Sequence, residues 1–231
     1  MTTHRSSYLI AFCAFAAFLI AGCANTSGTG GDLDTFLSEV RRTQRDYSPT
    51  SGPKELAGLA DLTVYGKIVG AEPGQLYAPL PDEPPMISTT VLAIDLYEVL
   101  GGDPTLVQDG MVFVEIAHPA FVGTKPEAIP DEPGNGQSSL VPYDTSAFAS
   151  QVPLLEGVFF LGDRTEEPYW ESVIDVGAGR PDGSHLFAAY TEGFLVESVS
   201  GELIGAIVPL AEMHDGWTGM TSIKEVIAAL D

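Results

Sequence analysis

Cysteine is scarce in this sequence: Cys13 and Cys23 are the only two among 231 residues. Everything beyond residue 23 is therefore without disulfides, the bonds that stabilise many small exported domains. The folded part must depend on its own hydrophobic core, and a chain of this length can bury about 70% of its unfolded surface. A single domain is the natural expectation for such a length.

Basic residues are also few, with 10 Lys and Arg against 32 Asp and Glu and a net charge of -22. Nucleic acids and anionic lipid head groups bind basic surfaces, so this composition excludes both as electrostatic partners. Acidic residues stand beside prolines at 82–85, 131–133 and 166–168, as is typical of exposed loops with solvated charge. Loose binding of divalent cations is the alternative interpretation, although the spacing of a calcium-binding loop is absent.

Long apolar runs are lacking except for residues 9–21, which follow a short polar start containing Arg5. This layout is typical of a secretory signal, and the run is short for a membrane span, which needs ~20 apolar residues. The run closes on a tetrapeptide that resembles a bacterial lipobox, Ile20-Ala21-Gly22-Cys23.

The lipobox resemblance implies that residues 1–22 are cut away and that the Cys23 thiol is joined to a diacylglycerol. Two acyl chains hold a protein stably at a membrane, since each buried methylene contributes about 0.8 kcal/mol. The protein is then expected at the extracytoplasmic face of the cell membrane, with the membrane as its first partner. An uncleaved signal anchor or an ordinary signal is the alternative, but it leaves Cys23 unexplained.

The remaining chain divides into a tether, a helical segment and a strand-rich domain. Residues 23–33 are mostly small and polar, which predicts a lipidated flexible tether that spans roughly 15 Å on average. Apolar residues at near-helical spacing, with an acidic start and arginines toward the end, predict a helix over 34–47, and 54–60 adds one more turn. The helical segment is therefore 34–60, and the β-barrel domain with its C-terminal helix is 61–231.

Strand signals dominate that domain. Alternation with period two predicts a strand over 62–71, and runs rich in β-branched and aromatic residues predict strands over 89–100 and 111–117. Gly66 and Gly70 interrupt the first strand and indicate the strong curvature of a small barrel. Five further apolar runs follow at the spacing of a meander: 157–162, 169–176, 185–190, 194–199 and 203–209.

Two further segments complete this survey. Residues 119–153 contain six prolines and little periodicity, and a segment of that length is either functional or mobile. Ser222-x-x-Glu225 is a capping box that opens onto apolar residues at helical spacing, which predicts a short C-terminal helix.

Three segments carry a wider resemblance: residues 60–70 (ADLTVYGKIVG), 97–101 (YEVLG) and 155–162 (LEGVFFLG). They look like uncharacterised envelope proteins with a netrin-like barrel of the metalloproteinase-inhibitor type. The resemblance implies a five-stranded oligonucleotide/oligosaccharide-binding (OB) type of barrel, an architecture that binds many unrelated ligands. In those inhibitors a free N-terminal cysteine chelates the protease zinc, whereas Cys23 would be acylated, so inhibition by that route is not expected.

Histidine is the first place to look for chemistry, and three lie beyond the signal: His118, His185 and His214. Only His214 has a carboxylate beside it, Asp215, and no His-x-x-x-His or His-Glu pair occurs. A metal or acid-base site would have to be assembled from distant segments. Structural or exposed histidines are therefore the expectation, and the metal ligands, if any, stay unknown.

Other motifs carry less chemistry. The glycine-rich residues 177–183 are superficially similar to a dinucleotide fingerprint, but Pro181-Asp182-Gly183 is turn chemistry that leads into a strand rather than a helix. Ser184 lies in no Gly-x-Ser-x-Gly elbow, so a serine hydrolase is not indicated. Three aromatic residues form either a ligand platform or part of the core or rim: Tyr169, Trp170 and Trp217.

These patterns predict an all-β fold: a small OB-like β-barrel or meander with a flanking N-terminal helix and a short C-terminal helix. The predicted function is that of a membrane-anchored envelope lipoprotein, a binding or structural module without cofactor or catalytic residues, for an unknown envelope protein or small ligand. The alternative is an envelope hydrolase or metal-dependent enzyme, which requires His185, His214 and acidic side chains to converge in one cleft. A binding module needs only an exposed apolar or concave patch.

Overall fold

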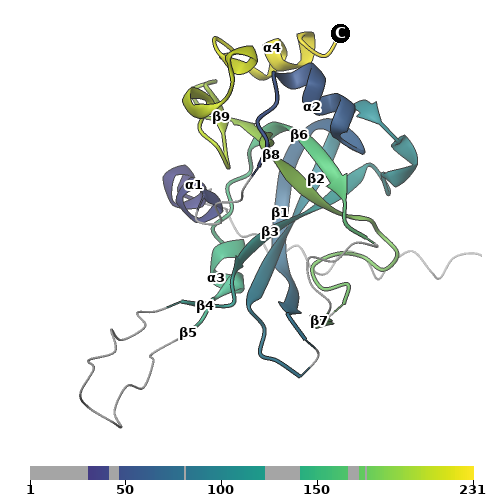
Figure 1. Ribbon diagram of the computed structural model, residues 1–231, viewed down its shortest axis with the longest axis vertical. Coiled ribbons are helices and arrows are strands. Elements are labelled where there is room, and N and C mark those ends of the chain that lie inside the picture. The colour runs from purple at the N-terminus through teal and green to yellow at the C-terminus, as the bar shows by residue number, and fades with distance from the viewer. Residues whose placement is uncertain (1–30, 42–46, 81, 123–140, 166–171, 175) are drawn as a thin grey trace, which may run out of the picture.

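Five strands of the computed structural model close into a barrel with short helices around it (Figure 1). The structure describes residues 31–41, 47–80, 82–122, 141–165, 172–174 and 176–231. In sheet order the barrel strands are β1 (Leu62–Ala78), β2 (Ile87–Gly102), β3 (Met111–Pro119), β8 (Leu186–Glu197) and β6 (Glu156–Asp163), and β6 pairs with β1 again. The predicted all-β barrel is confirmed.

One parallel pair distinguishes this barrel from a plain meander. β3 and β8 run parallel, with Phe113 opposite Leu186, whereas the other pairs that close the barrel are antiparallel. β8 thus lies between β3 and β6, and α3 (Thr145–Ala149) occupies the connection from β3 to β6. Of the two predicted alternatives, the structure is the OB-like barrel.

Glycines let β1 bend far enough to pair with both β2 and β6. Gly66 lies opposite Gly157 of β6, and a Cβ at position 66 would lie 2.5 Å from the Asp95 carbonyl oxygen of β2. Shifts in the β1–β2 register directly precede Gly66 and Gly70, as expected where a strand bulges and turns. The predicted curvature is confirmed, and the strand continues past the predicted end at residue 71 to Ala78.

β8 corrects the prediction of two separate strands at 185–190 and 194–199. The chain forms one strand there, and residues 190–193 bulge between the pairs Ala189–Leu161 and Phe194–Phe159. A Cβ at Gly193 would lie 2.7 Å from the Cβ of Phe160, so this glycine allows a close approach of two strands. From the sequence alone, Gly193 was interpreted as part of a turn between two strands.

Short strands extend the sheet beyond the barrel. β7 (Ser172–Ile174) pairs with the end of β1, β9 (Leu203–Gly205) pairs with the end of β8, and β4 (Phe121–Val122) pairs with β5 (Val141–Pro142). The strand predicted at 203–209 ends at Gly205, because the chain turns back so tightly that a Cβ there would lie 2.0 Å from the Val208 carbonyl oxygen. Residues 169–171 and 175 of another predicted strand lie outside the described residues, as do 123–140 of the proline-rich segment.

Helices flank the barrel at both predicted places. α1 (Leu33–Arg41) begins as predicted, although residues 42–46 lie outside the described residues and Tyr47 is no longer helical. α2 (Pro53–Leu59) and α4 (Ile223–Ala228) lie together at one end of the molecule, at the top of Figure 1. Three single 3-10 turns are η1 (Pro104–Leu106), η2 (Leu210–Glu212) and η3 (Asp215–Trp217). No described helix is long and apolar enough to cross a membrane.

The start of α4 differs in detail from the predicted capping box. Ser222 precedes the helix, but its side chain makes no cap hydrogen bond. The Glu225 carboxylate instead accepts the Thr221 backbone N–H at 2.6 Å and the Thr221 hydroxyl at 3.0 Å. The helix is therefore held one residue earlier than the motif indicates.

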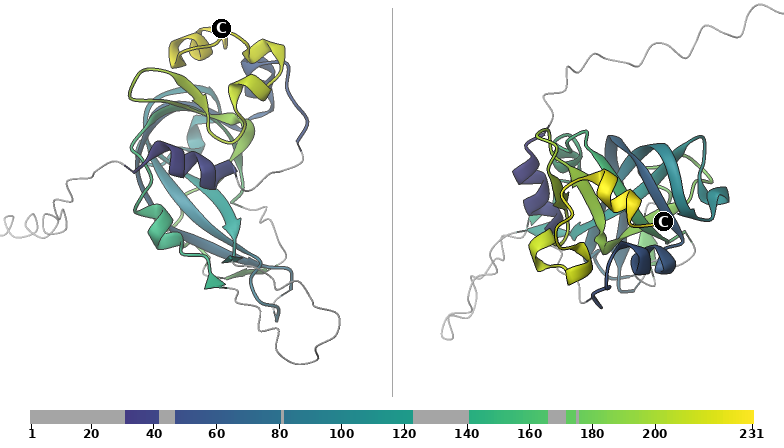
Figure 2. Two further views of the ribbon diagram at one scale, coloured as in Figure 1. Left: turned by 90° about the vertical axis from the view of Figure 1, so that its left-hand side faces the viewer. Right: turned by 90° about the horizontal axis from the view of Figure 1, so that it is seen from above.

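Three apolar clusters stabilise the domain. The largest fills the barrel interior and is closed by α1 and α3, which contribute Phe36 and Phe148. The second lies between the outer face of β6 and β8 and the helices α2 and α4, with Trp217 fully buried in it. A small third cluster consists of Val91, Phe113 and Leu186. Figure 2 shows α2 and α4 on this end and α1 against the side of the barrel. Since side chains fill the interior, any partner must bind on the outside of the barrel.

Candidate functional site

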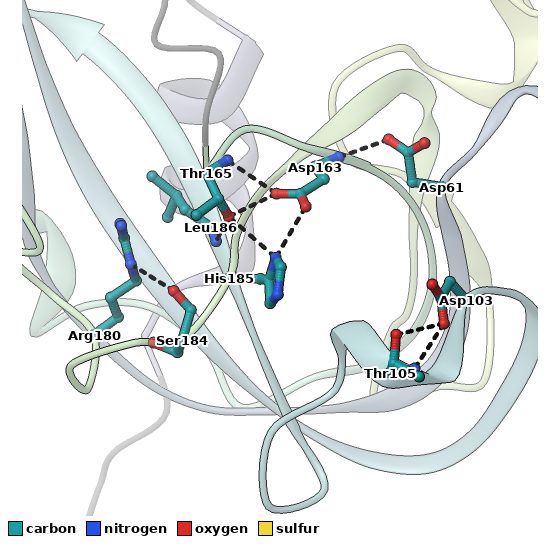
Figure 3. A network of polar contacts seen from close by, with 9 residues as sticks. All are labelled: Asp61, Asp103, Thr105, Asp163, Thr165, Arg180, Ser184, His185 and Leu186. Atoms are coloured by element: carbon teal, nitrogen blue, oxygen red, sulfur yellow. Dashed lines mark hydrogen bonds and ion pairs between the residues drawn. The ribbon is translucent and has the colours of Figure 1, made fainter.

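Several barrel strands bring polar residues together at one rim of the barrel, shown in Figure 3. Asp61 precedes β1, Asp103 follows β2, Asp163 ends β6 and His185 precedes β8. Backbone hydrogen bonds hold these strand ends together, because Asp61 N–H donates to Leu161 at 3.0 Å and Asp103 N–H donates to Asp61 at 3.0 Å. We call the following set the His185 rim: Asp61, Asp103, Asp163, Thr165 and His185.

The pair formed by His185 and Asp163 is the centre of this rim. The Nδ1 atom of His185 lies 2.9 Å from Oδ2 of Asp163, and the two side chains are 34% and 26% exposed. An ionised carboxylate only accepts hydrogen bonds, so Nδ1 of His185 is the donor to Asp163, and Nε2 is the other nitrogen of the ring. That Nε2 atom makes no hydrogen bond to the described residues.

Neighbouring groups fix the orientation of Asp163. Its Oδ1 accepts the Thr165 N–H at 2.9 Å and the Thr165 hydroxyl at 2.6 Å, and its own N–H donates to Asp61 Oδ2 at 2.8 Å. The Thr165 hydroxyl also accepts the Leu186 N–H at 2.9 Å. The bond to Asp61 joins the end of β6 to the start of β1, and the bond from Leu186 joins β8 to the end of β6, so the barrel itself positions the pair.

Two carboxylates of the rim, Asp163 and Asp103, have lowered pKa values. Burial by itself favours the neutral form of Asp163, but hydrogen bonds from Thr165 and His185 outweigh it and lower the pKa of this carboxyl. Asp103 accepts equivalent hydrogen bonds from Thr105, and these lower the pKa of the Asp103 carboxyl. The charge of His185 acts in the same direction. The imidazole of His185 therefore lies in negative surroundings.

This arrangement offers one kind of chemistry. An imidazole nitrogen beside ionised carboxylates can make a hydrogen bond to an incoming group, and its environment attracts cations. Among the described residues, no group of three His, Cys, Asp or Glu side chains is placed to hold a metal ion. The His185 rim thus presents one imidazole in an acidic setting.

The other two histidines lie in different surroundings. His118 is 2% exposed, its ring stacks on Tyr143 with centroids 4.5 Å apart, and its Nε2 lies 3.2 Å from Thr90 Oγ1. Burial lowers the pKa of His118 to about 4, so the ring is neutral at physiological pH. His214 directly precedes η3, and its charge acts on Glu55. His185 and His214 therefore have different carboxylate neighbours.

The remaining motifs have structural roles where the structure describes them. Ser184 is buried, and its hydroxyl donates to the Pro181 carbonyl at 2.5 Å within the predicted turn. The glycine-rich segment leads into β8, so it has no helix N-terminus for a phosphate. Trp217 has no exposed surface, so of its two interpretations the core is confirmed and the ligand platform is not.

Several predicted residues lie outside the described part of the chain. They are the lipid-attachment residue Cys23 with the signal and most of the tether, Tyr169 and Trp170, and the acidic segments 131–133 and 166–168. Of the predicted acidic loops, the structure describes Asp82 and Glu83, which are exposed in the connection between β1 and β2.

Sequence reasoning did not identify Asp163 and Thr165. One signal was present, because Asp-x-Thr occurs twice directly after predicted strands, at Asp103-Pro104-Thr105 and at Asp163-Arg164-Thr165. In both places the aspartate Oδ1 accepts the N–H and the hydroxyl of the threonine two residues later. This is the local turn that short polar side chains favour.

Comparison with known proteins gives no relative: no protein-family model, no curated protein and no solved structure matches the chain. The function is therefore argued from the residues themselves.

Replacement of Asp163 by alanine tests whether the rim is held together as described. We expect Asp163→Ala to lower the free energy of unfolding by roughly 2 kcal/mol, because Thr165 and His185 lose their acceptor in a partly buried place. Asp103→Ala is the matched control, since its side chain accepts hydrogen bonds from Thr105, two residues later on the surface, and it is expected to cost less than Asp163→Ala. Equilibrium urea unfolding measures both, and equal costs would contradict the assignment.

Proposed function

We propose that the protein is a lipoprotein of the bacterial cell envelope, anchored through Cys23, whose barrel acts as a binding module at the extracytoplasmic face of the membrane. The observation that carries this proposal is the apolar run 9–21 that closes on Ile20-Ala21-Gly22-Cys23. A small polar tether of about eight residues follows before the folded domain begins near Gly31.

The character of the domain supports an attached, exported module. It has a closed barrel with three apolar clusters, so it folds around its own core without any disulfide beyond residue 23. Its net charge of -22 opposes adsorption to anionic head groups, so the acyl chains must supply the attachment. The filled barrel interior directs binding to the outer surface.

Cys23→Ala is the direct test of the anchor. In a bacterial host grown with labelled palmitate, we expect the full-length chain to be labelled and the Cys23→Ala variant to lose the label completely. Cys13→Ala is the matched control and keeps the label, because that cysteine lies within the apolar run. Labelling is the deciding readout, since an uncleaved apolar run could itself hold the variant at the membrane.

Intact-mass measurement completes this test. The expected mass of the wild-type product corresponds to a chain that begins at Cys23 and carries a diacylglycerol. A free Cys23 thiol or a retained leader in material from the native host would contradict the proposal.

A further inference from the structure

The connection between β1 and β2 and the short strands β4, β5 and β7 lie toward the end of the molecule opposite α2 and α4, in the lower part of Figure 1. They carry apolar side chains that are between 36% and 60% exposed. We call this group the apolar tip: Leu80, Met86, Phe121, Val122, Val141 and Ile174.

Backbone pairing places the strand ends of the apolar tip side by side. Ile174 of β7 lies opposite Leu76 of β1, and the Met86 N–H donates to the Tyr77 carbonyl at 2.9 Å. The Ala120 N–H donates in turn to the Met86 carbonyl at 2.9 Å, and Val122 lies opposite Val141. The strand ends β7, β1, β2, β4 and β5 are thus side by side, and each adds an apolar side chain to the same end.

Acidic residues border this apolar surface. Asp82 and Glu83 are both exposed in the connection that joins Leu80 to Met86. The chain as a whole carries -22 charges, so the field around the tip is negative. An apolar centre with a charged rim is the usual anatomy of a protein–protein interface.

We propose that the apolar tip is the docking surface for a second protein of the envelope that presents apolar side chains flanked by Lys or Arg. Charge complementarity selects this partner. A second copy of the chain would bring the same acidic residues against each other, and a lipid surface would force Asp82 and Glu83 into the head-group layer beside the apolar side chains. This inference deepens the proposed function, because it names the class of partner for the binding module.

Photo-crosslinking in intact cells tests the proposal on the full-length chain. A photoreactive phenylalanine analogue replaces Met86 or Val141 in the tip and, as the matched control, Val199, which is fully exposed in the turn after β8. We expect Met86 and Val141 to give the same protein adduct, whose crosslinked peptide is apolar with Lys or Arg nearby, and Val199 not to give it. Combining Asp82→Lys with Glu83→Lys is expected to reduce the adduct on the order of tenfold, since charges at an interface rim steer association.

Each outcome decides the matter. Adducts with lipid, adducts with a second copy, an equal adduct from Val199, an adduct that charge reversal leaves unchanged, or no adduct at all would overturn the docking surface. A matching circular dichroism melt for the charge-reversed variant shows that the loss is not one of folding. Palmitate labelling at Cys23 is scored separately, so failure of the anchor and failure of the docking surface are distinguishable.

Discussion

Truncation of Trp217 to alanine is expected to lower the free energy of unfolding by about 3–5 kcal/mol, the usual cost of deleting a fully buried aromatic side chain. Trp217 has no exposed surface, and its ring meets the edge of Phe160 with centroids 6.0 Å apart and planes at 84°. Its cluster joins Leu56 of α2 and Val226 of α4 to the outer face of β6 and β8. Because domain stability is only about 5–15 kcal/mol, this loss is a large fraction of the total.

Trp217→Phe is the control that separates volume from hydrogen bonding. The indole Nε1 is buried and has no hydrogen-bond partner in the described structure, so phenylalanine removes a donor that contributes nothing. We expect this variant to cost about 1–2 kcal/mol through lost volume alone. Urea unfolding followed by far-ultraviolet circular dichroism measures both variants. A Trp217→Ala protein as stable as the wild type would mean that α2 and α4 do not depend on this contact.

The position of Trp217 could not be predicted from the sequence. The capping motif and the apolar spacing predict the C-terminal helix, but no local pattern indicates that η3 returns its tryptophan to the outer face of the barrel. That placement depends on Gly216, whose missing side chain lets the Ser51 carbonyl pass directly beside it. Contacts between positions 51 and 216 are set by tertiary packing, and a single sequence holds no signal for them.

The barrel strands could be predicted where apolar and polar residues alternate along the sequence and where glycine or proline marks the turns between them. Strands β1, β2, β3 and β6 follow apolar patterns. Asp109-Gly110 forms a tight turn before β3, with both residues at positive φ. The parallel pairing of β3 with β8 has no such marker, and nothing in the sequence analysis predicted it.

The His185 rim illustrates a similar limit. His185 was considered as a candidate, but its partner Asp163 is 22 residues away in the sequence and is brought to it by the pairing of β6 with β8. The local sequence indicates only the turn at Asp163-Arg164-Thr165. The apolar tip was likewise foreseen only as a requirement for some exposed patch, because its members come from five separate strand ends.

Acid is expected to destabilise the domain through His118 between pH 6.5 and about 4. The buried ring lies between Tyr143 and Phe148 at centroid distances of 4.5 and 4.6 Å, with no carboxylate among the groups that these contacts place against it. Burial lowers the pKa of His118 from 6.5 to about 4. In this window the unfolded chain binds a proton that the folded chain does not, so stability falls as the pH falls, by roughly 3 kcal/mol in total. Below about pH 4 both states are protonated and this loss is complete.

His118→Phe is expected to remove this dependence, because phenylalanine keeps the aromatic packing and cannot titrate. The difference in unfolding free energy between wild type and variant, measured by urea unfolding at intervals from pH 7 to pH 4, cancels the carboxylates that titrate in both proteins. Thr90→Val is the matched control. It removes the 3.2 Å contact with His118 Nε2, and we expect it to lower the free energy of unfolding by about 1 kcal/mol and to keep the acid dependence.

The Tyr143 ring that stacks on His118 also links it to α1, because the Tyr143 hydroxyl donates to Glu39 at 3.1 Å. We therefore expect protonation of His118 to weaken the packing of this helix. Parallel curves for wild type and His118→Phe would show that the ring is protonated in the folded protein as readily as in the unfolded chain.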